Sequence, residues 1–177
     1  MILWHAGLTM LIVWFVMRGN TRVDYRIVAV ASLLPDLIDK PIGRLIFRER
    51  FESGRIFAHT LLLNVLVFCI LFFMRGRIKR QLALIPISSL LHLAEDGVWS
   101  EPKIFWWPLF GTEFPKDPVS DGLLSFLNPA NISGVAWQEA VGLAAIGWLL
   151  ASHGMLNRRG VRSFLKTGRL ELAESSA

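Results

Sequence analysis

Imidazole and carboxylate side chains recur at the ends of apolar segments in the first hundred residues of the chain. His92 and Asp96 are four residues apart, so on a helix their side chains point to the same face. Imidazole nitrogen and carboxylate oxygen are ligands that zinc and other borderline divalent cations accept. The candidate metal ligands are therefore the three histidines and two aspartates at such ends: His5, Asp36, His59, His92 and Asp96.

Three further charged side chains stand close to these ligands in the sequence. Asp39 follows Asp36 by three residues and Glu95 precedes Asp96, so Asp39 and Glu95 are candidate general bases or hydrogen-bond partners of an imidazole. Arg55, or alternatively Arg44, is a candidate for neutralising the charge of a phosphoryl group. Taken singly, each of these side chains also fits a plainer role, such as ending a helix or bonding to a backbone carbonyl.

Composition indicates a membrane protein. Hydrophobic residues make up 53% of the 177, and the mean hydropathy is +0.47. The nineteen residues Ile56–Met74 contain only His59, Thr60 and Asn64 as strongly polar members, whereas a soluble core helix of this length has a polar face. We expect an all-α, multi-pass membrane bundle. The single cysteine, Cys69, excludes a disulfide or a multi-cysteine metal site within one chain.

The apolar segments predict about five membrane helices, which form one membrane domain over residues 1–155. Residues 156–177 are predicted to be a basic cytoplasmic tail. Several segments are shorter than the roughly 20 residues that a perpendicular span needs, so the bilayer is expected to thin locally or to be entered only in part. The expected spans are Ile2–Met17, Val23–Ile38, Ile56–Met74, Leu82–Ala94 and Val135–Ser152.

The positions of lysine and arginine indicate the orientation, because both are enriched in cytoplasmic loops. Most of the 19 basic residues lie after the first and third segments and in the tail, which predicts an outer N-terminus and a cytoplasmic C-terminus. Helices that alternate direction then bring all candidate ligands to the outer side, whereas His153 lies at the cytoplasmic end. The residues counted as cytoplasmic are Arg18, Arg22, Arg26, Arg75, Arg77, Lys79, Arg80, Arg158, Arg159, Arg162, Lys166 and Arg169.

Two long connections are expected on the outer side. Pro41–Phe51 alternates apolar and basic residues, including Arg44, and is predicted to be a short amphipathic helix in the membrane interface. Trp99–Pro118 combines aromatic residues with prolines and is predicted to be a loop at headgroup depth. An aromatic membrane anchor with no further role also fits the second connection.

The ordered motifs resemble the membrane-bound metal-dependent hydrolase family, also described as LexA-binding inner-membrane hydrolases. These motifs are Leu34-Pro35-Asp36, Gly54-Arg55-Ile-Phe-Ala-His59-Thr60 and His92-x-x-x-Asp96, with His5 before them and Trp107-Pro108 after them. The chain departs from the family pattern in two places: Asp39 stands three residues after Asp36, and Ser53 and Gly54 precede Arg55. The resemblance implies an inner-membrane protein with a metal site.

A more distant similarity is to the zinc-dependent phospholipase C superfamily. It implies a first metal site formed by Asp36, His59, His92 and Asp96, with His5 reaching a second metal that Asp96 bridges. The later histidine and glutamate ligands of that superfamily have no counterpart after Asp96, so a three-metal centre is not expected.

These observations favour a metal-dependent hydrolase, with zinc as the expected cofactor, that acts on a phosphoester of a lipid or lipid-linked substrate at the outer face. Two alternatives stay open: a metal-binding or ion-translocating membrane protein without catalysis, and a membrane scaffold that uses the basic tail. The expected partner is the lipid bilayer, and the sequence indicates no oligomeric state. Nucleic acid is not expected, because the basic residues follow the membrane flanks rather than one soluble face.

Overall fold

The computed structural model describes residues 1–17, 22–76, 78–116 and 129–170, and within these ranges it is helical and contains no strand. This confirms the all-α prediction. The elements are α1 (Ile2–Met17), α2 (Tyr25–Ala31), α3 (Leu34–Pro41), the π-helix η1 (Ile42–Ile46), α4 (Arg48–Phe51), the 3-10 helix η2 (Phe57–His59), α5 (Leu61–Phe73), α6 (Ile78–Leu82), α7 (Leu84–Glu95), the 3-10 helix η3 (Val98–Ser100), α8 (Pro102–Phe105), α9 (Pro129–Ser152) and α10 (Arg158–Thr167).

Among the described helices, α9 alone is both long and apolar enough to cross a membrane, over Val135–Ser152. The helices α1 and α5 are apolar but shorter; α1 coincides with the first expected segment, and α5 lies within the third. The prediction of about five spans therefore stays a prediction. Arg18 and Arg77 of the expected cytoplasmic connections, Pro118 of the aromatic connection and residues 171–177 of the tail lie outside the described ranges.

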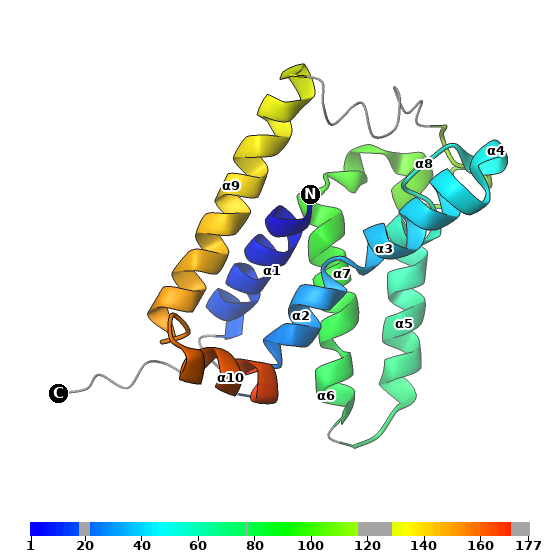
Figure 1. Cartoon of the computed structure of the whole chain (residues 1–177). Coiled ribbons are helices and arrows are strands. Elements are labelled where there is room, and N and C mark those ends of the chain that lie inside the picture. Colours follow the sequence, from blue (N-terminus) through cyan, green and yellow to red (C-terminus); the bar gives the residue numbers. More distant parts are fainter. Residues whose placement is uncertain (18–21, 77, 117–128, 171–177) are drawn as a thin grey trace.

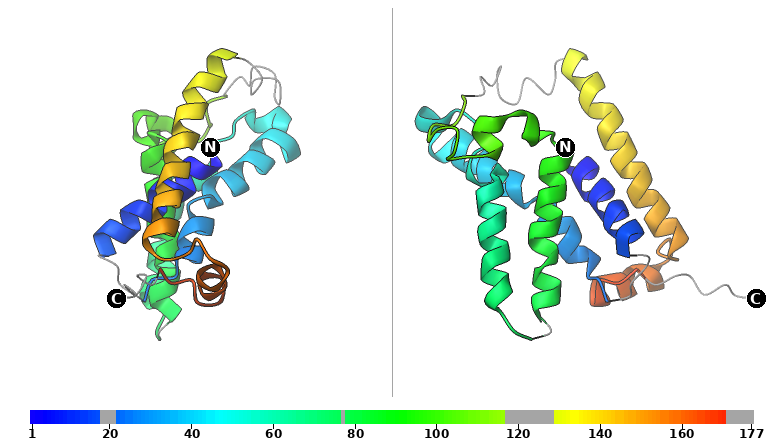
Figure 2. Two further views of the ribbon diagram at one scale, coloured as in Figure 1. Left: turned by 60° about the vertical axis from the view of Figure 1, so that its left-hand side comes forward. Right: turned by 180° about the vertical axis from the view of Figure 1, so that it is seen from behind.

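The long helices lie side by side, and three short ones cross them. The helix α9 runs along α1, and α5 runs along α7 (Figure 1). The segment α2–α3 crosses the bundle obliquely and packs against α1 and α7, while α10 lies across one end (Figure 2). Apolar side chains fill the end nearest α10; they are Met10, Val13, Val23, Tyr25, Val28, Leu84, Leu149, Met155 and Leu170.

The second expected span, Val23–Ile38, is wrong as a single helix. The helix α2 ends at Ala31, and α3 begins at Leu34 with Pro35 in its first turn. Proline has no backbone N–H and its ring collides with the carbonyl four residues earlier, which interrupts a continuous helix. The break lies against α7, where the carbonyl of Ser32 accepts a hydrogen bond from His92.

The third expected span begins later than predicted. The apolar helix α5 starts at Leu61, where the hydroxyl of Thr60 caps it by accepting a hydrogen bond from the Leu63 amide at 3.2 Å. The preceding residues, including His59, form the separate turn η2 rather than the first turn of that helix. The fourth expected span corresponds to α7 except for Leu82, which ends α6, and the fifth extends back to Pro129.

The two outer connections are partly folded. Pro41–Phe51 is not one amphipathic helix, because the end of α3 continues through η1 into the single turn α4. Trp99–Pro118 contains η3 and α8, and Phe114 is buried against Phe57 and Trp107. Several other apolar side chains of these connections are exposed, among them Leu45, Trp99, Leu109 and Phe110.

Two glycines allow α1 and α9 to approach closely. A Cβ atom on Gly7 would lie 2.2 Å from the carbonyl oxygen of Gly142, and one on Gly142 would lie 2.1 Å from the carbonyl oxygen of Leu3. Small residues at such a crossing bring the two backbones into contact. This contact holds the first two turns of α1, which carry His5.

The basic segment after residue 155 includes α10, which is held to the start of α2 by hydrogen bonds. The Tyr25 amide donates to the carbonyl of Gly168 at 2.7 Å, and Nη1 of Arg26 donates to the carbonyl of Leu165 at 2.6 Å. Gly168 has a φ of 70° and lies so close to Asp24 that a Cβ atom would be 1.9 Å from its carboxylate. Glycine is therefore required for this docking.

Candidate metal centre

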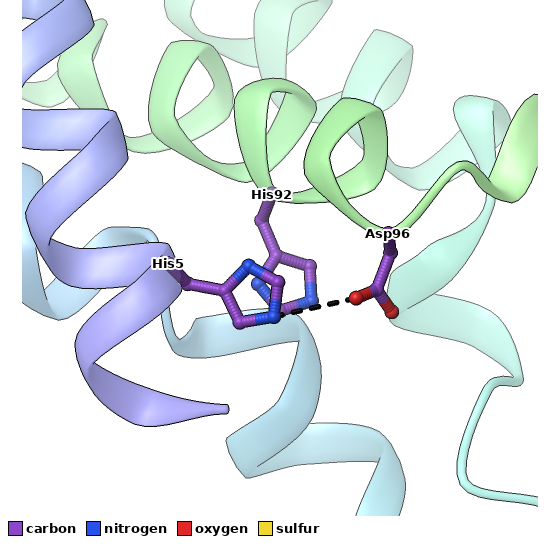
Figure 3. A group of neighbouring side chains, drawn as sticks. All are labelled: His5, His92 and Asp96. Carbon is purple, nitrogen blue, oxygen red and sulfur yellow. Dashed lines mark ion pairs between the residues drawn. The ribbon is translucent and has the colours of Figure 1, made fainter. Parts of the chain in front are cut away.

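The predicted ligands converge at one place, at the end of the bundle opposite α10. His5 comes from α1, while His92 lies in the last turn of α7 and Asp96 directly follows it; Figure 3 shows these three side chains pointing toward one another. One ligand atom from each lies within 4.8 Å of the other two. Asp36 on α3 and His59 in η2 form a second such group with the same His92.

The imidazole rings lie against one another. The Nε2 atoms of His59 and His92 are 3.3 Å apart, and the ring centroids of His5 and His92 are 3.9 Å apart. All three histidines are buried. Burial of three imidazoles in mutual contact in an apolar chain is costly unless each nitrogen has a partner.

Each ring is oriented by an oxygen atom that contacts its Nδ1 atom, on the side of the ring facing away from the other histidines. The Nδ1 atom of His5 lies 2.8 Å from Oε2 of Glu95, that of His59 lies 2.7 Å from Oδ2 of Asp39, and that of His92 lies 2.7 Å from the carbonyl oxygen of Ser32. A carbonyl oxygen only accepts hydrogen bonds, so Nδ1 of His92 donates and its Nε2 keeps a lone pair. A carboxylate accepts in the same way from His5 and His59.

With both rings neutral, this pattern leaves the Nε2 lone pairs of His59 and His92 facing each other. Two lone pairs at 3.3 Å repel, and a cation between the nitrogens relieves that repulsion. Outer hydrogen bonds that fix the ring tautomer are also typical of histidines that bind metals. The donor set and its orientation therefore fit a borderline divalent cation.

Asp39 is a positioning residue within this arrangement. Its buried carboxylate accepts hydrogen bonds from the amides of Ile56 at 2.8 Å, Ala58 at 2.9 Å and His59 at 3.1 Å, in addition to the bond from the His59 ring. These four donors explain why the segment before α5 is a turn. They also occupy the carboxylate, so of the two predicted roles the geometry favours the imidazole partner over the general base.

Glu95, the last residue of α7, has a similar role toward α1. Besides its contact with His5, the carboxylate accepts a hydrogen bond from the hydroxyl of Thr9 at 2.8 Å. Thr9 lies one helical turn after His5 and is buried. Sequence reasoning missed Thr9, although a hydroxyl four residues after a candidate ligand in an apolar helix is a usable signal.

The two aspartates of the cluster are each paired with a cation. Asp36 forms an ion pair with Lys40, and its Oδ1 lies 3.7 Å from Nε2 of His59 and 3.9 Å from Nε2 of His92. Asp96 lies 3.3 Å from Nε2 of His5, and its Oδ2 accepts a hydrogen bond from Nε of Arg55 at 3.1 Å. Lys40 was not among the predicted site residues.

A polar cavity of about 150 Å³ adjoins the cluster through Arg55. The Nη1 atom of Arg55 donates to the carboxylate of Glu101 at 2.9 Å, so this side chain links Asp96 to the cavity wall. The guanidinium of Arg44 packs against Gly54 close by. The cavity is lined by Ser53, Arg55, Glu101, Ile104, Pro115 and Lys116.

His153 lies outside the cluster, near the other end of α1. Its Nε2 accepts a hydrogen bond from the Trp14 indole at 3.0 Å, and Nδ1 lies 2.9 Å from the carbonyl of Leu149. Both ring nitrogens thus have partners from the protein. His153 is a natural control for any experiment on the cluster.

A family model described as YdjM inner membrane protein matches residues 1–161, a range that contains every residue of the cluster. This description confirms the prediction of an inner-membrane family, and it states no reaction. Comparison with curated proteins and with solved structures finds no match.

Proposed function

The chain belongs to the YdjM inner membrane protein family, and we propose that its buried cluster is a divalent metal site of a membrane-embedded hydrolase. The proposed ligands are His5, Asp36, His59, His92 and Asp96, and zinc is the proposed metal. The observation that carries the proposal is the pair of facing Nε2 atoms in His59 and His92, each on a ring whose Nδ1 is already bonded.

The proposed reaction is hydrolysis of a phosphoester. A divalent ion in such a site lowers the pKa of a bound water and polarises a phosphoryl oxygen. Arg55 supports this class of substrate, because its guanidinium reaches both the cluster and the polar cavity. Lys116 lines the same cavity and adds a second cation for a phosphate.

A lipid or lipid-linked substrate is proposed because the site lies within a bundle whose outer surface is apolar. The helix α5 exposes large apolar side chains on several sides, including Ile70, Phe72 and Phe73 at 64%, 72% and 81%. Apolar surface of this extent favours contact with lipid, and it supports a multi-pass arrangement. The proposed topology has the cluster on the outer side and α10 on the cytoplasmic side.

Metal binding without hydrolysis is the second candidate. The hydroxyl of Ser88 is buried one turn before His92 and has no hydrogen-bond partner among the described residues. A buried polar group of this kind along α7 favours a path for an ion or water leading away from the cluster. Turnover distinguishes the two candidates, since both require the same ligands.

The test begins with elemental analysis of the full chain, purified in detergent without chelator, beside the variants His92→Ala and His153→Ala. We expect bound zinc or another divalent metal in the unaltered protein and in His153→Ala, and loss of the metal in His92→Ala. Full metal occupancy in His92→Ala would refute the metal site.

Hydrolysis is then measured with phospholipids and polyprenyl phosphates in mixed micelles. We expect phosphate or phosphoester release that depends on metal and is lost in His59→Ala and His92→Ala. A metal-replete protein that cleaves none of these substrates would instead support the second candidate.

A further inference from the structure

The amphipathic helix α10 has an uneven charge distribution. Its ten residues include four basic side chains and no acidic one: Arg158, Arg159, Arg162 and Lys166. All four are exposed, and so are three apolar side chains beside them, Leu156, Val161 and Leu165 at 77%, 42% and 64%. Apolar side chains exposed next to a run of cations are typical of a helix that lies in a membrane interface.

The inner face of α10 is already occupied by the bundle. Gly160 approaches the backbone so closely that a Cβ atom would lie 2.2 Å from the carbonyl of Gly154, and Phe164 packs against the apolar core. The basic side chains fall on the opposite side of this helix, with Val161 and Leu165 along one edge. The outward surface therefore has no covering element among the described residues.

The position of α10 places that surface at the level of a membrane boundary. The helix α9, which is long and apolar enough to cross a bilayer, ends at Ser152, and α10 begins at Arg158. In Figures 1 and 2, α10 lies across the end of the bundle rather than along it. Hydrogen bonds from Arg26 and Tyr25 hold α10 in this orientation across the bundle.

We propose that α10 is a binding surface for anionic phospholipid headgroups, in which the four basic side chains contact lipid phosphates and Val161 and Leu165 enter the acyl boundary. Charge complementarity selects this occupant, because an anionic leaflet attracts cations and each further cation adds to the binding free energy. The surface is distinct from the cluster, which lies at the other end of α1.

The test uses a fluorophore on α10 of the full chain in lipid nanodiscs. Leu165→Cys is labelled in a Cys69→Ala background with an environment-sensitive dye, and quenching by a lipid with a nitroxide near its headgroup is measured. Nanodiscs contain either phosphatidylcholine alone or a mixture with phosphatidylglycerol. We expect strong quenching in the anionic mixture. Each neutralised charge should lower the ratio of membrane-inserted α10 to α10 that is not in contact with lipid about fivefold.

The decisive variant replaces Arg158, Arg159, Arg162 and Lys166 with glutamine. A matched variant replaces four exposed cations elsewhere, Arg48, Arg50, Arg75 and Lys103, and so carries the same net charge. Loss of the anionic-lipid effect in the first variant alone supports the proposal. Equal quenching in both lipid mixtures, equal behaviour of the two variants, or quenching in neither mixture, as expected for a surface reserved for an acidic protein, would overturn it.

Discussion

The carbonyl oxygen of Ser32 accepts a hydrogen bond from Nδ1 of His92 at 2.7 Å, although the two residues are sixty positions apart. The contact forms where α2 ends and α3 begins, and it determines which nitrogen of His92 faces the cluster. A backbone atom thus selects the tautomer that the proposed metal site would need. The break in the helix at this point is part of the site rather than an irregularity of the fold.

Replacing Pro35 with alanine should weaken metal binding without changing a ligand. Alanine allows α2 and α3 to continue as one helix, which would redirect the Ser32 carbonyl away from His92. We expect the metal affinity to fall about 10- to 100-fold, as for loss of other outer hydrogen bonds to ligating histidines. Competition with a fluorescent chelator measures the affinity. Pro102→Ala, at the first turn of α8, should leave it unaltered.

Asp36 and Asp39 should respond differently to replacement by asparagine. Asp36→Asn removes a proposed ligand at a partly exposed position, so metal should be lost with little change in the unfolding of the metal-free protein. In Asp39→Asn, buried backbone amides face the side-chain amide of asparagine. Each donor left without an acceptor lowers the free energy of unfolding by about 1–3 kcal/mol. The metal-free form of this variant should therefore unfold at clearly lower temperature. Equal thermal unfolding of the two variants would contradict these separate roles.

Arg55 should affect turnover more than metal content. Arg55→Gln removes the guanidinium that links Asp96 to the cavity, and we expect kcat/KM for a phosphoester to fall by about 100-fold or more, the usual effect of losing one charge-stabilising donor. Metal content is measured in the same preparation and should be retained. Lys103→Gln, an exposed change nearby, serves as control. An unaltered rate in Arg55→Gln would exclude it from the reaction.

The glycine contact between α1 and α9 should be sensitive to a single methyl group. Gly142→Ala places a Cβ atom 2.1 Å from the Leu3 carbonyl, and overpacking of this kind costs about 1–3 kcal/mol. Because His5 follows Leu3 by two residues, metal affinity should fall as well. Gly147→Ala is the matched control on the same helix, since a Cβ atom there meets nothing within 4 Å. Thermal unfolding of both variants in detergent checks the difference.

Docking of α10 should weaken in acid through Asp24. The hydrogen-bonded guanidinium of Arg26 lowers the pKa of the Asp24 carboxyl below its ordinary value of 3.8. The stabilisation is therefore present above the unfolded pKa and is lost as the pH falls through the lower folded value. Asp24→Asn should increase exchange of the Tyr25 amide at pH 7, relative to the unaltered protein. Below pH 3.8 the difference in protection between the two proteins should shrink; a constant difference would contradict the assignment.

Residue types and helical spacing were sufficient to predict the all-α fold and the candidate ligands. The spacing of His92 and Asp96 is a property of any helix, and the clustering of polar residues at segment ends follows from the cost of placing them in an apolar interior. The resulting expectation that His5, His59 and His92 meet agrees with the geometry.

Only tertiary contacts distinguished the roles of the neighbouring carboxylates Asp36 and Asp39. They also supplied the oxygen atoms that contact the Nδ1 atoms of the three histidines. Asp36 and Asp39 share a short segment, but only the turn before α5 presents three amides to one of them. The Ser32 carbonyl is invisible in sequence because every residue carries one, and its availability depends on where a helix breaks and what packs opposite. Sequence therefore determined which groups were present, while long-range packing decided their roles.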